Sequence, residues 1–267
     1  MSNYFRATSV QEAVSLYGTM RNAVYLAGGQ SLLSGFAYRP PVADFIDVRT
    51  IPQLRQIELG LDGLQIGAAI TLNEIMTNRK LREVCPVLAD ASAYVANHSV
   101  RNRSTIGGHV AFADSRSEVN LVLMISDARL LTSEREVSIR STIAGQRRSN
   151  LHPGELITGL RISSESLRMR FGVHEFTLRP SGGRALVTAA VKSDASGARP
   201  PTGVIAAVSG LTPVPLLLES TLGRNPIELL QNALPGVTQV SGHHVQLAIE
   251  ALRRAGNRIG TAFWADR

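Results

Sequence analysis

Two pairs of consecutive glycines are the strongest candidates in this chain for a ligand-binding site. The first pair, Gly28 and Gly29, ends a short apolar run at residues 23–27 and precedes Gln30 and Ser31. Glycines at the end of a strand let the backbone adopt positive φ and approach a ligand, and the amides of the following turn then point at an anion. This pattern indicates a phosphate-binding loop, with the Ser31 hydroxyl as a further donor. An ordinary tight turn between a strand and a helix fits the same residues.

A second glycine pair lies much further along the chain. Gly107 and Gly108 follow Thr105 and precede His109, in a polar stretch at residues 99–109. The Thr105 hydroxyl and the amides of the two glycines repeat the donor set of the first loop. One glycine pair alone is weak evidence, but two of them predict a pair of loops that close on one extended ligand.

Four stretches resemble, in order and spacing, the FAD-binding medium subunit of the molybdenum hydroxylases, the carbon monoxide dehydrogenase, xanthine dehydrogenase and aldehyde oxidase family. They are AGGQSLL (27–33), FIDVRTIPQL (45–54), GLQIGAAITLNEI (63–75) and VRNRSTIGGHVAFAD (100–114). The likeness runs from Tyr4 to about Val191 and continues more faintly to the C-terminus. It implies that the two glycine loops enclose the pyrophosphate of FAD.

The resemblance also implies contacts outside the loops. Glu118 falls where the family places an acid on the adenosine ribose, and Asp114 is a nearby alternative. Ile157, in a P-G-E-L-I stretch, falls where an apolar side chain lies against the adenine. Alone, the two acids could be solvated surface charges and Ile157 a core residue. The cofactor-binding set that the resemblance implies is Ala27, Gly28, Gly29, Gln30, Ser31, Leu32, Thr105, Ile106, Gly107, Gly108, His109, Asp114, Glu118 and Ile157.

Three positions depart from the family pattern. His109 stands where relatives usually carry Asn or Asp, Ser115 replaces a common proline, and Glu175 stands where many relatives have a lysine near the flavin ring. An acid at that position disfavours an anionic reduced flavin and is expected to lower its potential. Arg179 and Arg184 fall where the family has a basic stretch that passes toward the flavin; surface arginines are the alternative.

The sequence lacks the residues that disulfides, iron–sulfur clusters, metal sites and several catalytic motifs require. The single cysteine, Cys85, can neither form an internal disulfide nor hold an iron–sulfur cluster, so any cluster belongs to another chain. His243 and His244 have no third ligand at metal spacing, and no metal site is predicted. There is no Walker loop, G-x-G-x-x-G or nucleophile elbow. No catalytic residue is assigned, because a flavin would carry the chemistry.

The composition sets the broad class. The chain has 267 residues, a net charge of +7 and 44% hydrophobic residues, which suit one large or two moderate globular domains. Its arginines are scattered and no aromatic-basic motif accompanies them, so we expect an anionic cofactor or an acidic partner rather than nucleic acid. The sequence shows no apolar run long enough to span a membrane and no apolar signal core at its start, and a cytoplasmic protein is expected.

Hydrophobic periodicity predicts an α+β fold. Ser9 and Glu12 form a capping box that starts a helix, which with the strands on either side of the first loop makes a β-α-β unit. Further along we expect a hairpin at 54–68 with Asp62 and Gly63 in its turn, helices at 71–75, 87–98 and 120–127, and strands at 128–132 and 137–140. Beyond a polar linker at 163–167 we expect strands at 172–177, 185–192 and 203–209, and helices at 216–222, 226–234 and 244–255.

The family likeness organises these elements. It implies a two-subdomain FAD-binding domain, PCMH-like, at residues 1–166, with subdomains of about 1–52 and 53–166. A C-terminal domain at 167–267 would then hold a three-stranded antiparallel sheet with a helical bundle.

The resemblance implies an electron-transfer subunit and FAD-dependent oxidoreductase. A large partner subunit with a molybdenum cofactor hydroxylates the substrate, a small subunit with 2Fe-2S clusters relays electrons, and FAD in this chain passes them to an acceptor, in a dimer of heterotrimers. Two alternatives stand: a free-standing FAD oxidoreductase of the same fold, and a non-catalytic assembly subunit with a decayed flavin site. The substrate pocket would lie in another chain, so this sequence names neither the substrate nor the acceptor, whether NAD, oxygen, a quinone or a protein.

Overall fold

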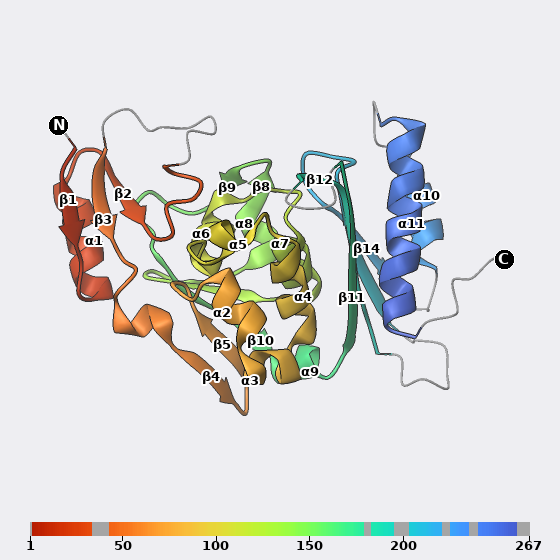
Figure 1. Ribbon diagram of the computed structural model, residues 1–267, viewed down its shortest axis with the longest axis horizontal. Coiled ribbons are helices and arrows are strands. Elements are labelled where there is room, and N and C mark those ends of the chain that lie inside the picture. Colours follow the sequence, from red (N-terminus) through yellow and green to blue (C-terminus); the bar gives the residue numbers. More distant parts are fainter. Residues whose placement is uncertain are drawn as a thin grey trace.

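The computed structural model describes residues 2–33, 43–178, 183–194, 203–220, 225–234 and 240–260. The three larger sheets of the described residues follow one another along the long axis of the molecule in Figure 1, from the N-terminal unit on the left to the C-terminal unit on the right. A group of short helices covers the central sheet. Within the part of the chain that is described, no helix has both the length and the apolar character needed to cross a bilayer.

The N-terminal unit is the predicted β-α-β arrangement. Its elements are β1 (Tyr4–Arg6), α1 (Val10–Thr19), β2 (Ala23–Leu26) and β3 (Asp44–Asp47), with the parallel strands in the order β1-β3-β2. The Ser9 hydroxyl accepts from the Glu12 amide at 3.1 Å, as a helix N-cap should. The Glu12 carboxylate accepts from the amide and hydroxyl of Thr8 instead of from Ser9, so the predicted capping box is closed one residue earlier.

The central unit is a five-stranded sheet in the order β4-β5-β10-β6-β7. Its strands are β4 (Ile57–Gly60), β5 (Gly63–Gly67), β6 (Arg129–Thr132), β7 (Glu136–Ser138) and β10 (Ile157–Ser163). The helices of this unit are α2 (Leu72–Thr77), α3 (Arg79–Val84), α4 (Pro86–Tyr94), α5 (His98–Arg101), α6 (Ile106–Phe112) and α7 (Glu118–Ile125). Shorter elements are η1 (Pro52–Arg55), α8 (Ile139–Thr142), β8 (Ile143–Gly145), β9 (Arg148–Ser149) and α9 (Ser164–Leu167).

Several predicted boundaries in this unit are wrong. The single helix expected at 87–98 is α4 followed by α5, because Ala96 takes a left-handed conformation with φ 43° that no helix continues through. The strand expected at 137–140 ends at Ser138, whose hydroxyl caps α8 by accepting from the Arg140 amide. The predicted hairpin is present as β4 and β5, but Gly60 pairs with Gly63, so its turn is Leu61 and Asp62 instead of Asp62 and Gly63. Its first strand starts at Ile57 instead of residue 54, because Pro52–Arg55 form η1.

The C-terminal unit is an antiparallel sheet between two helical layers. Its strands are β11 (Arg170–Thr177), β12 (Ala185–Ser193), β13 (Val204–Ser209) and β14 (Leu216–Ser220), hydrogen-bonded in that order. In Figure 1, α10 (Pro226–Ala233) and α11 (Gly242–Arg258) cover the outer face and α7 lies against the inner face. Inward-facing Val173, Ala190 and Ala207 join the core of the central unit, while Val187 and Ala189 belong to the core beneath α11.

The helix predicted at 216–222 is wrong, because residues 216–220 form the strand β14. The sheet therefore has four strands instead of three, and the described residues contain two covering helices, α10 and α11, instead of a bundle. A run of five residues such as Leu216–Ser220 fits a helix or a strand equally well by periodicity alone. Strand pairing selects the extended conformation, because β14 hydrogen-bonds along the edge of β13. The register pairs Val204 with Ser220 at one end and Val208 with Leu216 at the other.

We predict that Gly172→Ala strongly destabilises the packing of α11 on β11. A Cβ added at Gly172 would lie 1.9 Å from the carbonyl oxygen of Ala255, which is backbone and cannot rotate away. We expect the free energy of unfolding in urea to fall by about 1–3 kcal/mol. Gly242→Ala, at the start of the same α11, meets nothing within 4 Å and serves as the control with little or no loss. Equal stability of the two variants would contradict this packing.

Candidate functional site

The two glycine loops meet backbone to backbone. A Cβ added at Gly28 would lie 2.0 Å from the carbonyl oxygen of Arg103, which immediately precedes the second loop. Gly29, with φ 70°, has the left-handed conformation that glycine adopts without strain. The first glycine is thus required by close approach and the second by the turn. The sequence prediction of two loops brought together is what the structure shows.

A cleft of about 270 Å³ lies between the loops. A second, smaller cavity of about 100 Å³ adjoins it, since Tyr25, Ala27, Gly108 and Ala111 line both. The remaining wall of the larger cavity is Leu26, Gly28, Gly29, Gln30, Ser31, Leu32, Ser104, Thr105, His109 and Phe112. The remaining wall of the smaller cavity is Val48, Leu54, Ala68, Ala69, Gly107, Leu151, Glu155, Leu156 and Ile157. One elongated site results, with polar groups along one part and an apolar end.

The loops differ in the hydrogen-bonding capacity of their amides. Within the described residues, the backbone amides of residues 28–32 donate to no protein acceptor, and the loop is closed by the Leu33 amide donating to the Gly29 carbonyl at 2.8 Å. Successive free amides that face a cavity form an anion-binding concavity. The first loop therefore has the donor set that the sequence predicted.

The second loop does not offer the amides expected of it. The Ile106 amide donates to the Ile70 carbonyl at 2.9 Å, the Gly107 amide to the Ala68 carbonyl at 2.9 Å, and the Gly108 amide to the Thr105 hydroxyl at 3.2 Å. These bonds fasten the start of α6 to the central unit, so the expected repeat of backbone donors is wrong. The second loop instead presents the Ser104 and Thr105 side chains and the bare surface of Gly108.

The other predicted residues divide into those that line the site and those that do not. Ala27, Gln30, Ser31, Leu32 and His109 line the larger cavity, and Ile157 lines the smaller one. Ile106 is fully buried in the core, and Asp114 and Glu118 line neither cavity. Arg179 lies outside the described residues.

His109 is a neutral wall residue. Its Nε2 lies 2.5 Å from the hydroxyl oxygen of Ser117, which itself accepts from the Asn120 amide. Burial lowers the pKa of His109 to about 4, against a smaller opposing effect of Asp114. At neutral pH the ring is therefore uncharged, and it offers the cleft a hydrogen bond but no positive charge.

The two acids have partners away from the cleft. Asp114 pairs with Arg184 at 3.5 Å and accepts from the Arg116 amide at 3.0 Å. Glu118, the first residue of α7, is 7% exposed, and its carboxyl group hydrogen-bonds to Glu175 of β11. Glu118 thus lies in the interface with the C-terminal sheet and lines neither cavity.

The apolar end is closed by residues that the motifs did not single out. The Tyr25 hydroxyl donates to the Gly154 carbonyl at 2.8 Å, and the Tyr25 ring stacks on Tyr17 of α1 with centroids 5.2 Å apart. Burial raises the pKa of Tyr25 to about 12, so this phenol remains a donor. These contacts join the N-terminal unit to the loop before β10. Only apolar patterning could have marked Tyr17 and Tyr25, and it does not distinguish cleft from core.

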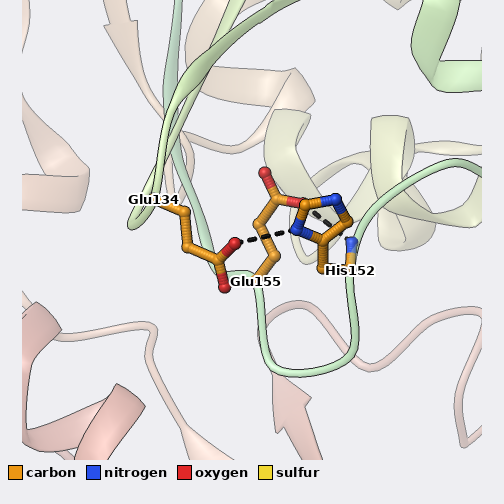
Figure 2. A group of neighbouring side chains, drawn as sticks. All are labelled: Glu134, His152 and Glu155. Carbon is orange, nitrogen blue, oxygen red and sulfur yellow. Dashed lines mark hydrogen bonds and ion pairs between the residues drawn. The ribbon is translucent and has the colours of Figure 1, made fainter.

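An ion-pair network holds the same loop (Figure 2). His152 Nδ1 lies 2.9 Å from Glu134 Oε2, and the Glu155 carboxylate accepts from the His152 amide at 2.7 Å. One ligand atom from each of these three side chains lies within 4.8 Å of the others. However, Arg135 donates to both oxygens of Glu155, through Nε at 2.9 Å and Nη2 at 3.0 Å. A guanidinium therefore fills the position that a cation would need, and the network fastens the cavity wall.

The fold and cleft define a cofactor-binding class, and comparison with known proteins identifies it. Residues 1–164 match the family described as FAD binding domain in molybdopterin dehydrogenase. The chain belongs to this family, which confirms the resemblance indicated by the sequence motifs.

Two curated relatives and one solved structure show how far the similarity extends. The 6-hydroxypseudooxynicotine dehydrogenase complex subunit alpha of Paenarthrobacter nicotinovorans is 31% identical over 166 residues, which cover 60% of this chain and 56% of that protein. The glyceraldehyde dehydrogenase medium chain of Sulfolobus acidocaldarius is 30% identical over 165 residues, covering 60% and 59%. The chain thus spans less than two thirds of either relative. Quinoline 2-oxidoreductase from Pseudomonas putida 86 shares the fold, with a TM-score of 0.86 at 23% identity over 97% of each chain.

We predict that Glu155→Gln destabilises the protein and removes part of its acid sensitivity. The Glu155 side chain has no exposed area, and losing its charge-assisted bonds is expected to cost about 1.5–3 kcal/mol at neutral pH. The hydrogen bond from Arg135 lowers the pKa of Glu155 to about 2. Because the folded pKa lies below the unfolded value of about 4.3, this stabilisation is complete above that value and is lost as the pH falls toward 2.

Urea unfolding at several pH values measures this effect. The stability difference between wild type and Glu155→Gln should shrink as the pH falls through that window. Glu83→Gln, in the exposed pair with Arg79, is the control and should change stability by about 0.5 kcal/mol or less. A difference between wild type and Glu155→Gln that stays constant through the acid range would contradict the role given to Glu155.

Proposed function

We propose that this chain binds FAD across the cleft and transfers electrons from 2Fe-2S clusters of a partner subunit to an external acceptor. The observation that carries the proposal is the run of amides at residues 28–32, which donate to no described acceptor and belong to a loop that lines the cleft. A diphosphate needs such backbone donors and close approach more than it needs a formal positive charge. Family membership supplies the identity of the dinucleotide.

The cavities suggest how the cofactor would lie. The pyrophosphate would contact residues 28–32 and the hydroxyls of Ser104 and Thr105, and the adenine would enter the apolar cavity beside Ile157. The isoalloxazine would then extend toward His109 and Phe112. When bound, FAD supplies the two-electron chemistry, so the residues of this chain bind, orient and exclude water.

Partner subunits follow from the same proposal. Burial raises the pKa of Cys85, which is 3% exposed, to about 11, so this thiol is neither a ligand nor a nucleophile at neutral pH. The clusters and the molybdenum cofactor would therefore reside in a small and a large partner subunit, in a cytoplasmic dimer of heterotrimers. The name "medium chain" of the Sulfolobus relative agrees with a complex of this kind. We further propose a PCMH-like FAD-binding domain at 1–166, with subdomains of about 1–52 and 53–166, and a C-terminal domain at 167–267.

We predict that Gly108→Val abolishes tight FAD binding without unfolding the chain. A side chain at Gly108 would project into the cleft, where its Cβ would lie 3.8 Å from the Ala27 Cβ and 3.0 Å from the Thr105 hydroxyl oxygen. Titration followed by flavin fluorescence should show at least tenfold weaker binding, about 1.4 kcal/mol or more. Gly60→Val, on the open edge of β4, meets nothing within 4 Å and should bind as wild type does. No saturable FAD binding by the wild type would refute the proposal.

The electron-transfer role has its own test. The tagged chain, isolated from its natural host, should bring down two further subunits together with molybdenum and iron. Rapid mixing of the isolated, FAD-loaded chain with partner subunits that were reduced by dithionite and freed of excess reductant should bleach the flavin absorbance. A flavin-containing chain that never associates with iron or molybdenum would overturn the assignment to a complex while leaving FAD binding intact.

A further inference from the structure

A buried polar row crosses the otherwise apolar interface between α7 and the C-terminal sheet. Glu175 of β11 pairs in register with Thr188 of β12, and Thr188 pairs with Ser209 of β13. Each lies two residues from Val173, Ala190 or Ala207, which face the core beneath α7. Because alternate residues of a strand share a face, all three polar side chains point toward α7. One end of this interface is thus polar in three adjacent strands.

The hydroxyls of this row have no protein partner. Thr188 is fully buried and Ser209 is 1% exposed, and neither hydroxyl oxygen hydrogen-bonds to a described residue. The side-chain oxygen of Asn120, on the facing helix α7, is likewise buried and without a partner there. Buried polar atoms are normally satisfied, by ordered water where protein groups are absent. This end of the interface therefore holds three buried polar atoms that the described protein groups leave unsatisfied.

Two carboxyl groups meet in the same interface. Glu118 enters it from the start of α7 and hydrogen-bonds to Glu175. Two carboxylate ions cannot form that bond, since neither has a donor, so the pair must hold at least one proton. Burial raises the pKa of Glu118 well above its ordinary value, and the bond to Glu175 raises it further. Burial also raises the pKa of Glu175, so the two carboxyl groups hold a shared proton.

Charges of the neighbouring elements do not neutralise the pair. Asp114 acts on Glu118 as a further negative charge, and it holds Arg184 in its own ion pair. His109, bonded to Ser117, is uncharged at neutral pH because burial lowers its pKa to about 4. Among the described residues, no arginine or lysine forms an ion pair with Glu118 or Glu175.

Charged groups elsewhere on these elements lie away from the pair. Lys192 of β12 faces α7 near its far end, where Asp127 and Arg140 are its charged neighbours. Arg254 of α11 interacts with His174 on the opposite face of the sheet. Asp90 of α4 is exposed. The pair thus depends on its own proton for charge balance.

A short path joins the pair to the cleft. His109 lines the larger cavity, its ring contacts Ser117 at 2.5 Å, and Ser117 directly precedes Glu118. In a buried environment of low effective dielectric, charge gained in the cleft is screened less than it would be in water. Negative charge there favours the protonated form of the pair.

We propose that Glu118 and Glu175 form a proton-exchange site that balances the charge gained by the cofactor on reduction. The inference rests on the proposed binding of FAD. Bound flavin that gained two electrons from a reductant and one proton would carry one additional negative charge. The pair, which shares one proton beforehand, would then take one proton from solvent by way of the buried Thr188 and Ser209 hydroxyls. An O–H bond would form on the remaining carboxylate, no covalent bond would break in the protein, and the buried region would gain no net charge.

The pH dependence of flavin reduction tests this directly. In the full chain loaded with FAD and reduced stepwise by dithionite, the reduction equilibrium constant of the wild type should depend on pH more steeply than that of Glu118→Gln/Glu175→Gln. One proton taken up adds a factor of about ten per pH unit. Glu58→Gln, at an exposed acid on β4, removes one negative charge, as the double variant does, but away from the pair, and should retain the wild-type slope.

A second measurement does not depend on the variants. The infrared difference spectrum of wild-type chain, reduced minus oxidised, should show a protonated-carboxyl carbonyl band that shifts in D2O and disappears in Glu118→Gln/Glu175→Gln. Equal pH slopes, or no carboxyl band, in protein that binds FAD would overturn the inference and leave the proposed function standing. Failure of the wild type to bind FAD would overturn both.

Discussion

The close contact between the Gly28 backbone and the Arg103 carbonyl is the constraint on which the site depends. A side chain at position 28 would overlap that oxygen at 2.0 Å, so the two loops can adjoin only because the residue is glycine. The contact brings the N-terminal β-α-β unit against the start of α6, and the cleft forms along their junction. Tyr25, through Gly154, makes the matching connection at the apolar end. Two junctions, one polar and one apolar, therefore fix the length of the site.

The electrostatics of the cleft follow from how the fold uses its polar groups. Many arginines are engaged with acids elsewhere, as Arg135 is with Glu155 and Arg184 with Asp114, and His109 is neutral. In the described residues, the positive end of the site thus consists of backbone amides and hydroxyls. Amide donors hold an anion by position, with less dependence on salt than exposed arginines have. The net charge of +7 is accordingly not a measure of cofactor affinity.

The sequence predicted the pairing of the loops because ordered motifs carry spatial information that single motifs lack. It also predicted β11, β12 and β13, whose apolar alternation is long enough to be unambiguous. It failed where a tertiary partner decides the outcome. Residues 216–220 form a strand because they pair with the edge of β13. The amides of Gly107 and Gly108 donate to the Ala68 carbonyl and the Thr105 hydroxyl, and are therefore not available to a ligand. The partner of Glu118 lies in a strand far along the chain, and no local pattern identifies such a contact.

A titration of the nitrogen-15-labelled chain with FAD, followed by amide NMR, tests whether the amides of residues 28–32 donate hydrogen bonds to the cofactor. The account predicts that the amide signals of residues 28–32 move downfield and become protected from exchange, as newly formed hydrogen bonds require. The amides of Gly107 and Gly108 should already be protected before FAD is added, because they donate within the protein. Protection that FAD induces at Gly107 and Gly108 and not at residues 28–32 would contradict the account.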